Sequence, residues 1–217
     1  MPRRPSKPAA SRRRSRPNGP GQAANAKTGQ QRLRIIAGRW RGRKLKFADL
    51  PGLRPTTDRV RETLFNWLQT QLPGARVLDL FAGSGALGLE ALSRGASHLT
   101  LVDTAAAAVD QLKQNLRLLD ALDDSTLVQA SATSWLQQAP SEPGYDLVLL
   151  DPPYGKGLLA DCCEQLNQRQ LIRPGGWIYV EAEAELQPLP VPSNWRLHRQ
   201  LKAGQGSCYL YQLDDEQ

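Results

Sequence analysis

Short apolar runs alternate with longer segments of helical character along most of the chain. Five of these runs have the length and composition of buried strands: Arg76–Leu80, Leu99–Asp103, Thr126–Ala130, Asp146–Leu150 and Trp177–Val180. The segments between them, near residues 85–94, 105–119, 132–138 and 156–171, predict helices. This βαβ order predicts an α/β fold with a mostly parallel sheet and helices on both of its faces.

The two ends of the pattern differ from its middle. Trp195–Lys202 and Ser207–Leu213 are separated by only four residues, which leaves no room for a crossover helix. These two strands are therefore expected to form a C-terminal antiparallel hairpin. Near the other end, Arg32–Ala37 and Lys44–Phe47 flank a glycine-containing turn and predict a basic β-hairpin. A helix is expected to follow it, with Thr57 as its N-cap.

Apolar residues are missing from the first 30 positions, which contain no Val, Ile, Leu, Phe, Trp or Tyr. Because such a segment cannot offset its ordering entropy by burial, residues 1–30 are expected to be a disordered basic tail. A transit peptide would share this composition, but the five prolines within the first twenty positions oppose its amphipathic helix. We expect 31–217 to form a single domain, with the hairpin and helix over 31–73 and the core over 74–217.

Charge is distributed unevenly along the chain, whose net charge is +7. Residues 1–28 carry eight Lys and Arg and no acid, and residues 29–61 carry ten against two acids. Residues 62–217 carry ten basic and nineteen acidic residues. Residues 1–61, which we call the basic front, are therefore strongly positive, whereas the rest of the chain is acidic. This asymmetry predicts a polyanionic partner, most simply nucleic acid.

Composition excludes several classes of protein. No stretch approaches the roughly 18 consecutive apolar residues of a membrane span, so no membrane association is expected. Three cysteines, of which Cys162 and Cys163 are adjacent, do not make a disulfide framework and favour a reducing, cytoplasmic compartment. Two histidines offer no zinc-ligand spacing, so no metal is expected.

A glycine-rich loop follows the first strand of the core. Gly83, Gly85 and Gly88 fit the pattern of a dinucleotide-binding turn, and Asp103 lies where a ribose-binding acid is expected. Asp79, four residues before the first glycine, would repel a pyrophosphate on this loop. It favours instead a ligand with cationic groups, and S-adenosylmethionine carries a sulfonium and an ammonium. A plain strand-to-helix turn is the structural alternative.

The second motif, Asp151-Pro152-Pro153-Tyr154, follows the fourth strand of the core, at the carboxyl edge where open α/β sheets bind ligands. The prolines stiffen the turn and remove two N–H donors, which leaves the Asp151 carboxylate and the Pro152 carbonyl as acceptors. Two acceptors suit an exocyclic amino group, and Tyr154 offers a face on which a base can stack. These four residues are the candidate catalytic set, with a rigid turn as the structural alternative.

The motifs together resemble the bacterial RsmD family of the class I methyltransferases, which have a Rossmann-like sheet. The segments that carry the resemblance are Arg34–Gly42, Arg54–Phe65, Asp79–Gly85 and Asp151–Tyr154. The resemblance implies S-adenosylmethionine-dependent methylation of the guanine N2 amine at guanine 966 of 16S ribosomal RNA. It also implies the small ribosomal subunit or its assembly intermediate as partner, and a monomer.

The resemblance implies a set of cofactor-binding residues. They are Asp79, Phe81, Gly83, Ser84, Gly85, Asp103, Ser131 and Asp151. One departure is visible, because many methyltransferases place an acid for the adenine amino group where this chain has Ser131. The contact to adenine is therefore the least determined part of the predicted site.

RNA-binding candidates lie in the basic front of the chain: Arg39, Trp40, Arg41, Arg43, Lys44, Arg54, Arg59 and Arg61. A solvated surface, with Trp40 packed on the sheet, is the alternative. Arg59 and Arg61 stand near a helix start, where cations oppose the helix dipole, and this conflict indicates a function. Glu181, Glu183 and Glu185 are expected to be a solvated strand exit.

Three other functions compete with this prediction. A DNA adenine-N6 or cytosine-N4 methyltransferase would use the same Asp-Pro-Pro-Tyr chemistry, although this chain has no visible target-recognition domain. A non-catalytic RNA-binding assembly factor would not need Asp79, the glycines and Asp151 together. An NAD-dependent oxidoreductase is disfavoured by Asp79 and by the lack of a recognisable hydride-transfer acid or base.

Overall fold

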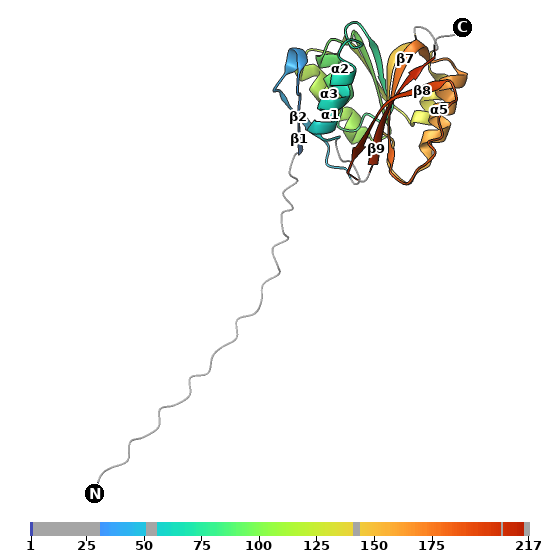
Figure 1. The fold of residues 1–217 in the computed structure, drawn as a ribbon. Coiled ribbons are helices and arrows are strands. Elements are labelled where there is room, and N and C mark those ends of the chain that lie inside the picture. The colour runs from blue at the N-terminus through green and yellow to red at the C-terminus, as the bar shows by residue number, and fades with distance from the viewer. Residues whose placement is uncertain (2–30, 51–55, 141–143, 205, 215–217) are drawn as a thin grey trace.

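The computed structural model describes residues 1, 31–50, 56–140, 144–204 and 206–214 (Figure 1). The tail expected over residues 1–30 lies outside the described residues except for Met1, and so does the RNA-binding candidate Arg54.

A seven-stranded sheet forms the centre of the molecule, with the strand order β5-β4-β3-β6-β7-β9-β8. The strands are β3 (Arg76–Asp79), β4 (His98–Asp103), β5 (Ser125–Gln129), β6 (Tyr145–Leu150), β7 (Ile172–Glu183), β8 (Trp195–Ala203) and β9 (Gly206–Leu213). The first five pair in parallel, whereas β9 runs antiparallel to both β7 and β8. The expected α/β architecture, a mostly parallel sheet with a C-terminal antiparallel hairpin, is confirmed.

Helices cover both faces of the sheet, because successive strand residues point to opposite sides. The helices are α1 (Asp58–Trp67), α2 (Gly88–Ser93), α3 (Ala106–Leu118), α4 (Ala132–Gln138) and α5 (Leu158–Gln168). Val77 and Leu149 pack with α1, α2 and α3, and the alternating residues Leu78 and Val148 pack with α4 and α5. Figure 1 shows α1 to α3 on one side and α5 on the other.

The N-terminal hairpin forms a second, two-stranded sheet from β1 (Gln31–Arg34) and β2 (Lys44–Phe47), with the short 3₁₀ helix η1 (Gly38–Trp40) in its turn. It lies on the side of α1 to α3 (Figure 1). The carboxylate of Glu90 in α2 accepts hydrogen bonds from the backbone N–H groups of Ile36 at 2.8 Å and Ala37 at 3.0 Å. A buried carboxylate of the core therefore anchors the predicted hairpin.

The predicted boundaries of one helix and one strand are wrong, and each error has a physical reason. The helix expected near residues 85–94 begins at Gly88, because Gly85 has a φ of 78°, which is incompatible with an α-helix. The strand expected over Trp177–Val180 extends to Glu183, because β9 pairs with it from Trp177 to Glu183. Glu181 therefore lies inside a strand rather than in a solvated exit.

Within the described residues, none of the helices is long and apolar enough to cross a membrane.

Candidate functional site

Three carboxylates meet at one edge of the sheet. Asp79 ends β3, Asp103 ends β4, and Asp151 directly follows β6. Because β3 lies between β4 and β6 and all three strands are parallel, their carboxyl ends point to the same edge. The chain leaves β3 toward β4 and β5 and later returns to β6 on its other side, so the crevice that binds ligands in open α/β sheets is expected here.

The glycine loop is held by the two carboxylates beside it. The backbone N–H of Gly83 donates to Asp103 Oδ2 at 2.7 Å, and that of Ala105 donates to Asp103 Oδ1 at 2.8 Å. The N–H of Gly88, the first residue of α2, donates to Asp79 Oδ2 at 3.0 Å. Asp79 and Asp103 therefore fix the loop while each oxygen keeps a lone pair that can accept from a ligand.

Close packing and a φ of 78° both favour glycine at residue 85. A Cβ at Gly85 would lie 2.6 Å from a methyl of Leu112 and 2.7 Å from one of Leu89. A Cβ at Gly88 would lie 2.9 Å from Leu99 and 3.0 Å from Asp79 Oδ2. The loop can therefore sit close to α3 and to the carboxylate only if these two positions have no side chain.

The ionised forms of the carboxyl groups at this edge of the sheet are disfavoured, which raises their pKa values. Burial raises the pKa of Asp79 from 3.8 to about 7, and the nearby Asp103 carboxylate contributes to the shift. Burial also raises the pKa of Asp151 well above its usual range, followed by repulsion from Glu181 and Asp79. The Oγ1 of Thr56, just before α1, donates to Asp151 Oδ2 at 3.4 Å. Such perturbed carboxyl groups in one crevice are typical of a functional site.

Sequence reasoning missed Glu181. Its carboxylate is half-buried and accepts from the hydroxyl of Tyr179 at 3.0 Å, and it lies close enough to the Tyr154 hydroxyl to shift the pKa of both groups. Burial raises the pKa of Glu181. The expected solvated exit is therefore wrong for this residue. The alternation of Tyr179 and Glu181 could have revealed it, because both point to the same face of a continuous strand.

The remaining cofactor candidates lie around the loop. Ser84 is buried, and Phe81 is partly buried against the α4–α5 face. Ser131 is exposed and acts as the N-cap of α4, where its hydroxyl oxygen accepts from the N–H of Ser134 at 3.1 Å. The structure therefore gives Ser131 a local role, and its hydroxyl proton and second lone pair remain for other partners.

Trp40 is wrong as a base-stacking candidate. It is only 7% exposed and belongs to the main core cluster, because it packs between η1 and the helices beneath it. The guanidinium of Arg39 covers the ring at 4.0 Å and pairs with Asp124 at 2.8 Å. The exposed candidates Arg41, Lys44 and Arg59 remain accessible, and Arg43 is exposed although it donates to the Leu118 carbonyl at 3.0 Å.

Arg61 is likewise wrong as an RNA-binding candidate, because its side chain is completely buried. It donates to Asp58 Oδ1 at 2.6 Å and to the Arg34 carbonyl at 3.0 Å, and it lies 3.6 Å from Glu90. Glu90 is equally buried and pairs with Arg94 at 2.7 Å. The conflict between a cation and the helix start is resolved here by a structural ion-pair network.

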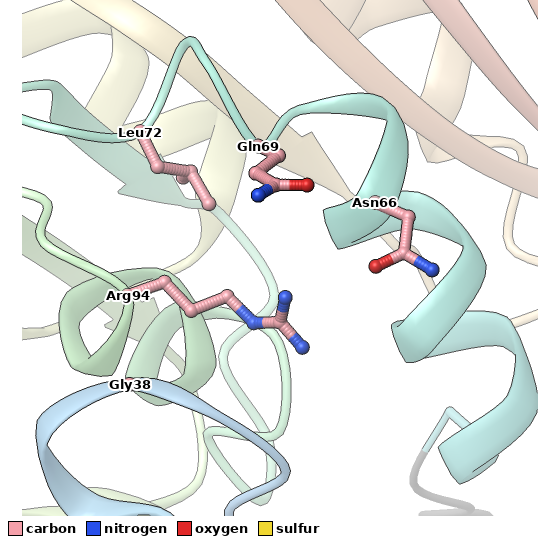
Figure 2. Close-up of a pocket in the computed structure, with 5 residues that line it drawn as sticks. All are labelled: Gly38, Asn66, Gln69, Leu72 and Arg94. Atoms are coloured by element: carbon pink, nitrogen blue, oxygen red, sulfur yellow. The ribbon is translucent and has the colours of Figure 1, made fainter.

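An open pocket of about 270 Å³ lies away from the carboxylate edge. It is lined by Gly38, Asn66, Gln69, Leu72 and Arg94, and Figure 2 shows the Arg94 guanidinium extending between the hairpin and α1. The backbone at Gly38 lies so close to the end of α2 that only glycine fits, because a Cβ would lie 1.9 Å from the Ser93 carbonyl oxygen. None of the candidate catalytic or cofactor residues lines this pocket.

Metal binding finds no support in the described part of the chain. Among those residues, no group of three or more His, Cys, Asp and Glu is arranged to hold an ion.

Comparison with known proteins gives consistent matches over most of the chain. The family model described as conserved hypothetical protein 95 matches residues 33–212. The chain is 48% identical over 187 residues to ribosomal RNA small subunit methyltransferase D of Escherichia coli K12, covering 86% of this chain and 93% of that protein. It is 42% identical over 192 residues to the protein of the same name from Haemophilus influenzae, covering 88% and 97%. The solved structure of Escherichia coli yhhF aligns with a TM-score of 0.79 and 45% identity, covering 86% of this chain and 100% of that one.

Proposed function

The chain belongs to the RsmD family of methyltransferases, and we propose that it methylates the N2 amine of a guanine in small-subunit ribosomal RNA. It has a class I methyltransferase fold and is an S-adenosylmethionine-dependent enzyme. The observation that carries the proposal is the juxtaposition of Asp79, Asp103 and the Asp151 turn at the carboxyl ends of three adjacent strands. Guanine 966 is the position we propose, on the family resemblance.

The chemistry of the carboxylates fits a cationic cofactor. Burial raises the pKa values of Asp79 and Asp151, and repulsion from neighbouring acids raises them further. A ligand with an ammonium and a sulfonium would supply the missing positive charge. We infer that Asp79 and Asp103 would hold the amino acid and ribose parts, with Phe81, Gly83, Ser84, Gly85 and Ser131 around them. S-adenosylmethionine supplies an activated methyl group on its sulfonium.

The Asp-Pro-Pro-Tyr turn would hold the acceptor amine. The Asp151 carboxylate and the Pro152 carbonyl would each accept one N–H of the guanine amine, and Tyr154 would stack on the base. This grip directs the nitrogen lone pair away from the turn, so most of the rate enhancement would come from orientation. As the new N–C bond forms, the nitrogen becomes cationic and loses one proton. Asp151 is suited to accept that proton because burial and neighbouring acids raise its pKa.

The exposed face of the N-terminal hairpin supports an RNA partner. In the β1–β2 register, Arg32 lies opposite Lys46 and Arg34 lies opposite Lys44, and all four are exposed. Like charges directly opposite each other destabilise a hairpin, so this arrangement is expected to serve a polyanion. The target guanine must leave its stack to reach the turn, as in enzymes that flip bases. We place the enzyme in the cytoplasm, as a monomer acting on the small subunit or its assembly intermediate.

Labelled methyl transfer to small ribosomal subunits and to their naked RNA, both from cells lacking this protein, tests the proposal. Digestion to nucleosides should place the label in N2-methylguanosine, and the better substrate identifies the stage of assembly. Label in adenosine or cytidine would refute the guanine assignment. Absence of label from protein that binds the cofactor would favour a DNA substrate or a binding function.

The variant Asp151→Ala should lose at least 99% of turnover while it retains cofactor affinity within a few-fold. The measurement pairs single-turnover methylation with calorimetric titration of S-adenosylmethionine. A variant that still methylates at near the normal rate would show that Asp151 does not hold the acceptor amine.

A further inference from the structure

The hydroxyl of Tyr154 lies directly against the backbone of β9. A Cβ at Gly206, the first residue of β9, would lie 2.1 Å from the Tyr154 hydroxyl oxygen and 3.3 Å from the ring carbon that bears it. Gly206 does not have a positive φ, so its backbone conformation does not require glycine. The Tyr154 hydroxyl, together with the Ala182 carbonyl oxygen at 3.0 Å, leaves no room for a side chain at this position.

A second contact holds the same hydroxyl. The Glu181 carboxylate lies close enough to the Tyr154 hydroxyl to shift the pKa of both groups, and its Oε2 accepts a hydrogen bond from the Tyr179 hydroxyl at 3.0 Å. Tyr179 is fully buried, so it fixes the carboxylate from the side of the core. Because Glu181 and Gly206 belong to strands that pair along this stretch, one rigid surface presents both contacts to Tyr154.

The tyrosine needs such support because its own segment gives little. Tyr154 is 44% exposed and lies in a turn outside any helix or strand. It is followed by Gly155 and Gly157, both with positive φ values, which only glycine adopts readily. The next residue, Gly155, is itself held by β7, because its N–H donates to the Glu183 carboxylate.

We propose that Glu181, Tyr179 and Gly206 form a cradle that sets the orientation of the Tyr154 ring, and that Glu181 and Gly206 are positioning residues for the target base. This inference rests on the proposed function, in which Tyr154 stacks on the guanine. The cradle acts through the hydroxyl, whereas the stacking face of the ring stays free. It therefore explains why a tyrosine with a defined direction, rather than any aromatic residue, suits the turn.

A double-mutant cycle tests the cradle. Gly206→Ala should lower the kcat for RNA methylation at least tenfold, because the new methyl group displaces the hydroxyl, while the affinity for S-adenosylmethionine stays within twofold. Tyr154→Phe removes the hydroxyl through which the cradle acts, so it should also lower kcat, and the double variant Gly206→Ala/Tyr154→Phe should be no more than twofold slower than Tyr154→Phe. A double variant that is slower than Tyr154→Phe by the full factor that Gly206→Ala costs the wild type would overturn the proposal, since the lost rate would not pass through the hydroxyl.

Glu181→Gln keeps the size of the side chain and an acceptor oxygen, and it serves as a second variant should Gly206→Ala fold poorly. It should lower kcat less than Glu181→Ala does. The matched control is Glu185→Gln, because Glu185 is exposed four residues further along the chain and undergoes the same change of charge. An equal loss of kcat in the control and in Glu181→Gln would overturn the proposal.

A readout independent of RNA separates the cradle from the proposed function. Nitration of Tyr154 by tetranitromethane, followed by mass spectrometry of its peptide, reports how accessible and how acidic the phenol is. Burial and the Glu181 carboxylate raise the pKa of Tyr154, which slows nitration in the wild type. Nitration should be at least threefold faster in Gly206→Ala and in Glu181→Ala and unchanged in Glu185→Gln. Unchanged nitration in the first two variants overturns the cradle, whereas a wild type that nitrates as expected but fails to methylate RNA refutes only the function.

Discussion

Replacing Asp79 by Asn separates the contribution of this residue to cofactor binding from its effect on folding. The carboxylate of Asp79 is buried at the end of β3 and accepts from the Gly88 N–H at 3.0 Å. An Asn side chain has the same shape, and its carbonyl oxygen can accept the same hydrogen bond, but it does not ionise. The substitution therefore removes the negative charge and leaves the packing in place.

The magnitude follows from the pKa of Asp79, which rises from 3.8 to about 7 in the folded protein. Because the folded state binds this proton more tightly than the unfolded state, stability is fully present below pH 3.8 and is lost as the pH rises through 7. Each unit of pKa difference corresponds to about 1.4 kcal/mol, so the full loss is about 4 kcal/mol. Roughly 2.5 kcal/mol of it falls between pH 5 and pH 8.

Urea denaturation of the cofactor-free proteins at pH 5 and pH 8 measures this effect. Asp79→Asn has no such ionisation, so the unfolding free energy of the variant should gain about 2.5 kcal/mol over that of the wild type between these pH values. Calorimetric titration should show at least a tenfold weaker binding of S-adenosylmethionine to the variant. A stability difference that is the same at both pH values would refute the buried-charge argument, and unchanged cofactor affinity would refute the binding role.

Three further predictions concern the anchor of the hairpin, the glycine loop and the basic face. Glu90→Ala should lower the unfolding free energy by about 3–5 kcal/mol, because Arg94 and the backbone N–H groups of Ile36 and Ala37 lose their partner and the buried Arg61 loses one of its two carboxylates. The exposed Glu62→Ala should change it by less than about 0.5 kcal/mol, and urea denaturation measures both. Gly85→Ala should lower the unfolding free energy by about 1–3 kcal/mol and weaken cofactor binding, because the new methyl group meets leucines of α2 and α3 and residue 85 has a positive φ. Thermal melting measures the effect on stability, and calorimetry measures the effect on cofactor binding. Lys44→Ala should reduce the slope of log RNA affinity against log salt concentration by about 1, whereas Lys113→Ala on α3 should leave this slope unchanged. Filter binding at four salt concentrations measures both slopes, and equal slopes for the two variants would contradict the proposed RNA face.

The parallel part of the sheet was predictable because each of its strands is marked in the sequence by one short run of mostly apolar residues. Runs such as Arg76–Leu80 and Asp146–Leu150 are mostly apolar, with Val77, Leu78 and Leu80 in the first and Leu147–Leu150 in the second, as buried parallel strands require on both faces. Asp79, Asp103 and Asp151 were predictable for the related reason that parallel strands deliver their ends to one edge. These features depend on local sequence and on one topological rule, so no tertiary contact was needed to infer them.

The mistaken residues all depend on contacts between distant parts of the chain. Arg61 has the sequence signature of a free cation at a helix start, but it is buried against two partners that lie far from it in the sequence, the Arg34 carbonyl and the Glu90 carboxylate of α2. Trp40 lies among arginines in the sequence, but its ring is directed into the core. Glu181 follows an apolar run like a solvated exit, and only the pairing of β7 with β9, in which it lies opposite Cys208, keeps it inside the sheet near Tyr154. A single sequence without its pairings does not distinguish these environments.

The position of β9 between β7 and β8 sets the order in which the enzyme can be assembled during its synthesis. Gly206 opens a strand that ends only four residues before the C-terminus of the chain. The hairpin, β3, β4 and β5 can leave the ribosome and pair early, since domains are built from the N-terminal end. The surface behind Tyr154 exists only after the last strand has inserted. Under the proposed function, a nascent chain would present its basic front before Gly206 completes the support behind Tyr154, and a chain that lacks β9 would keep that front without the support.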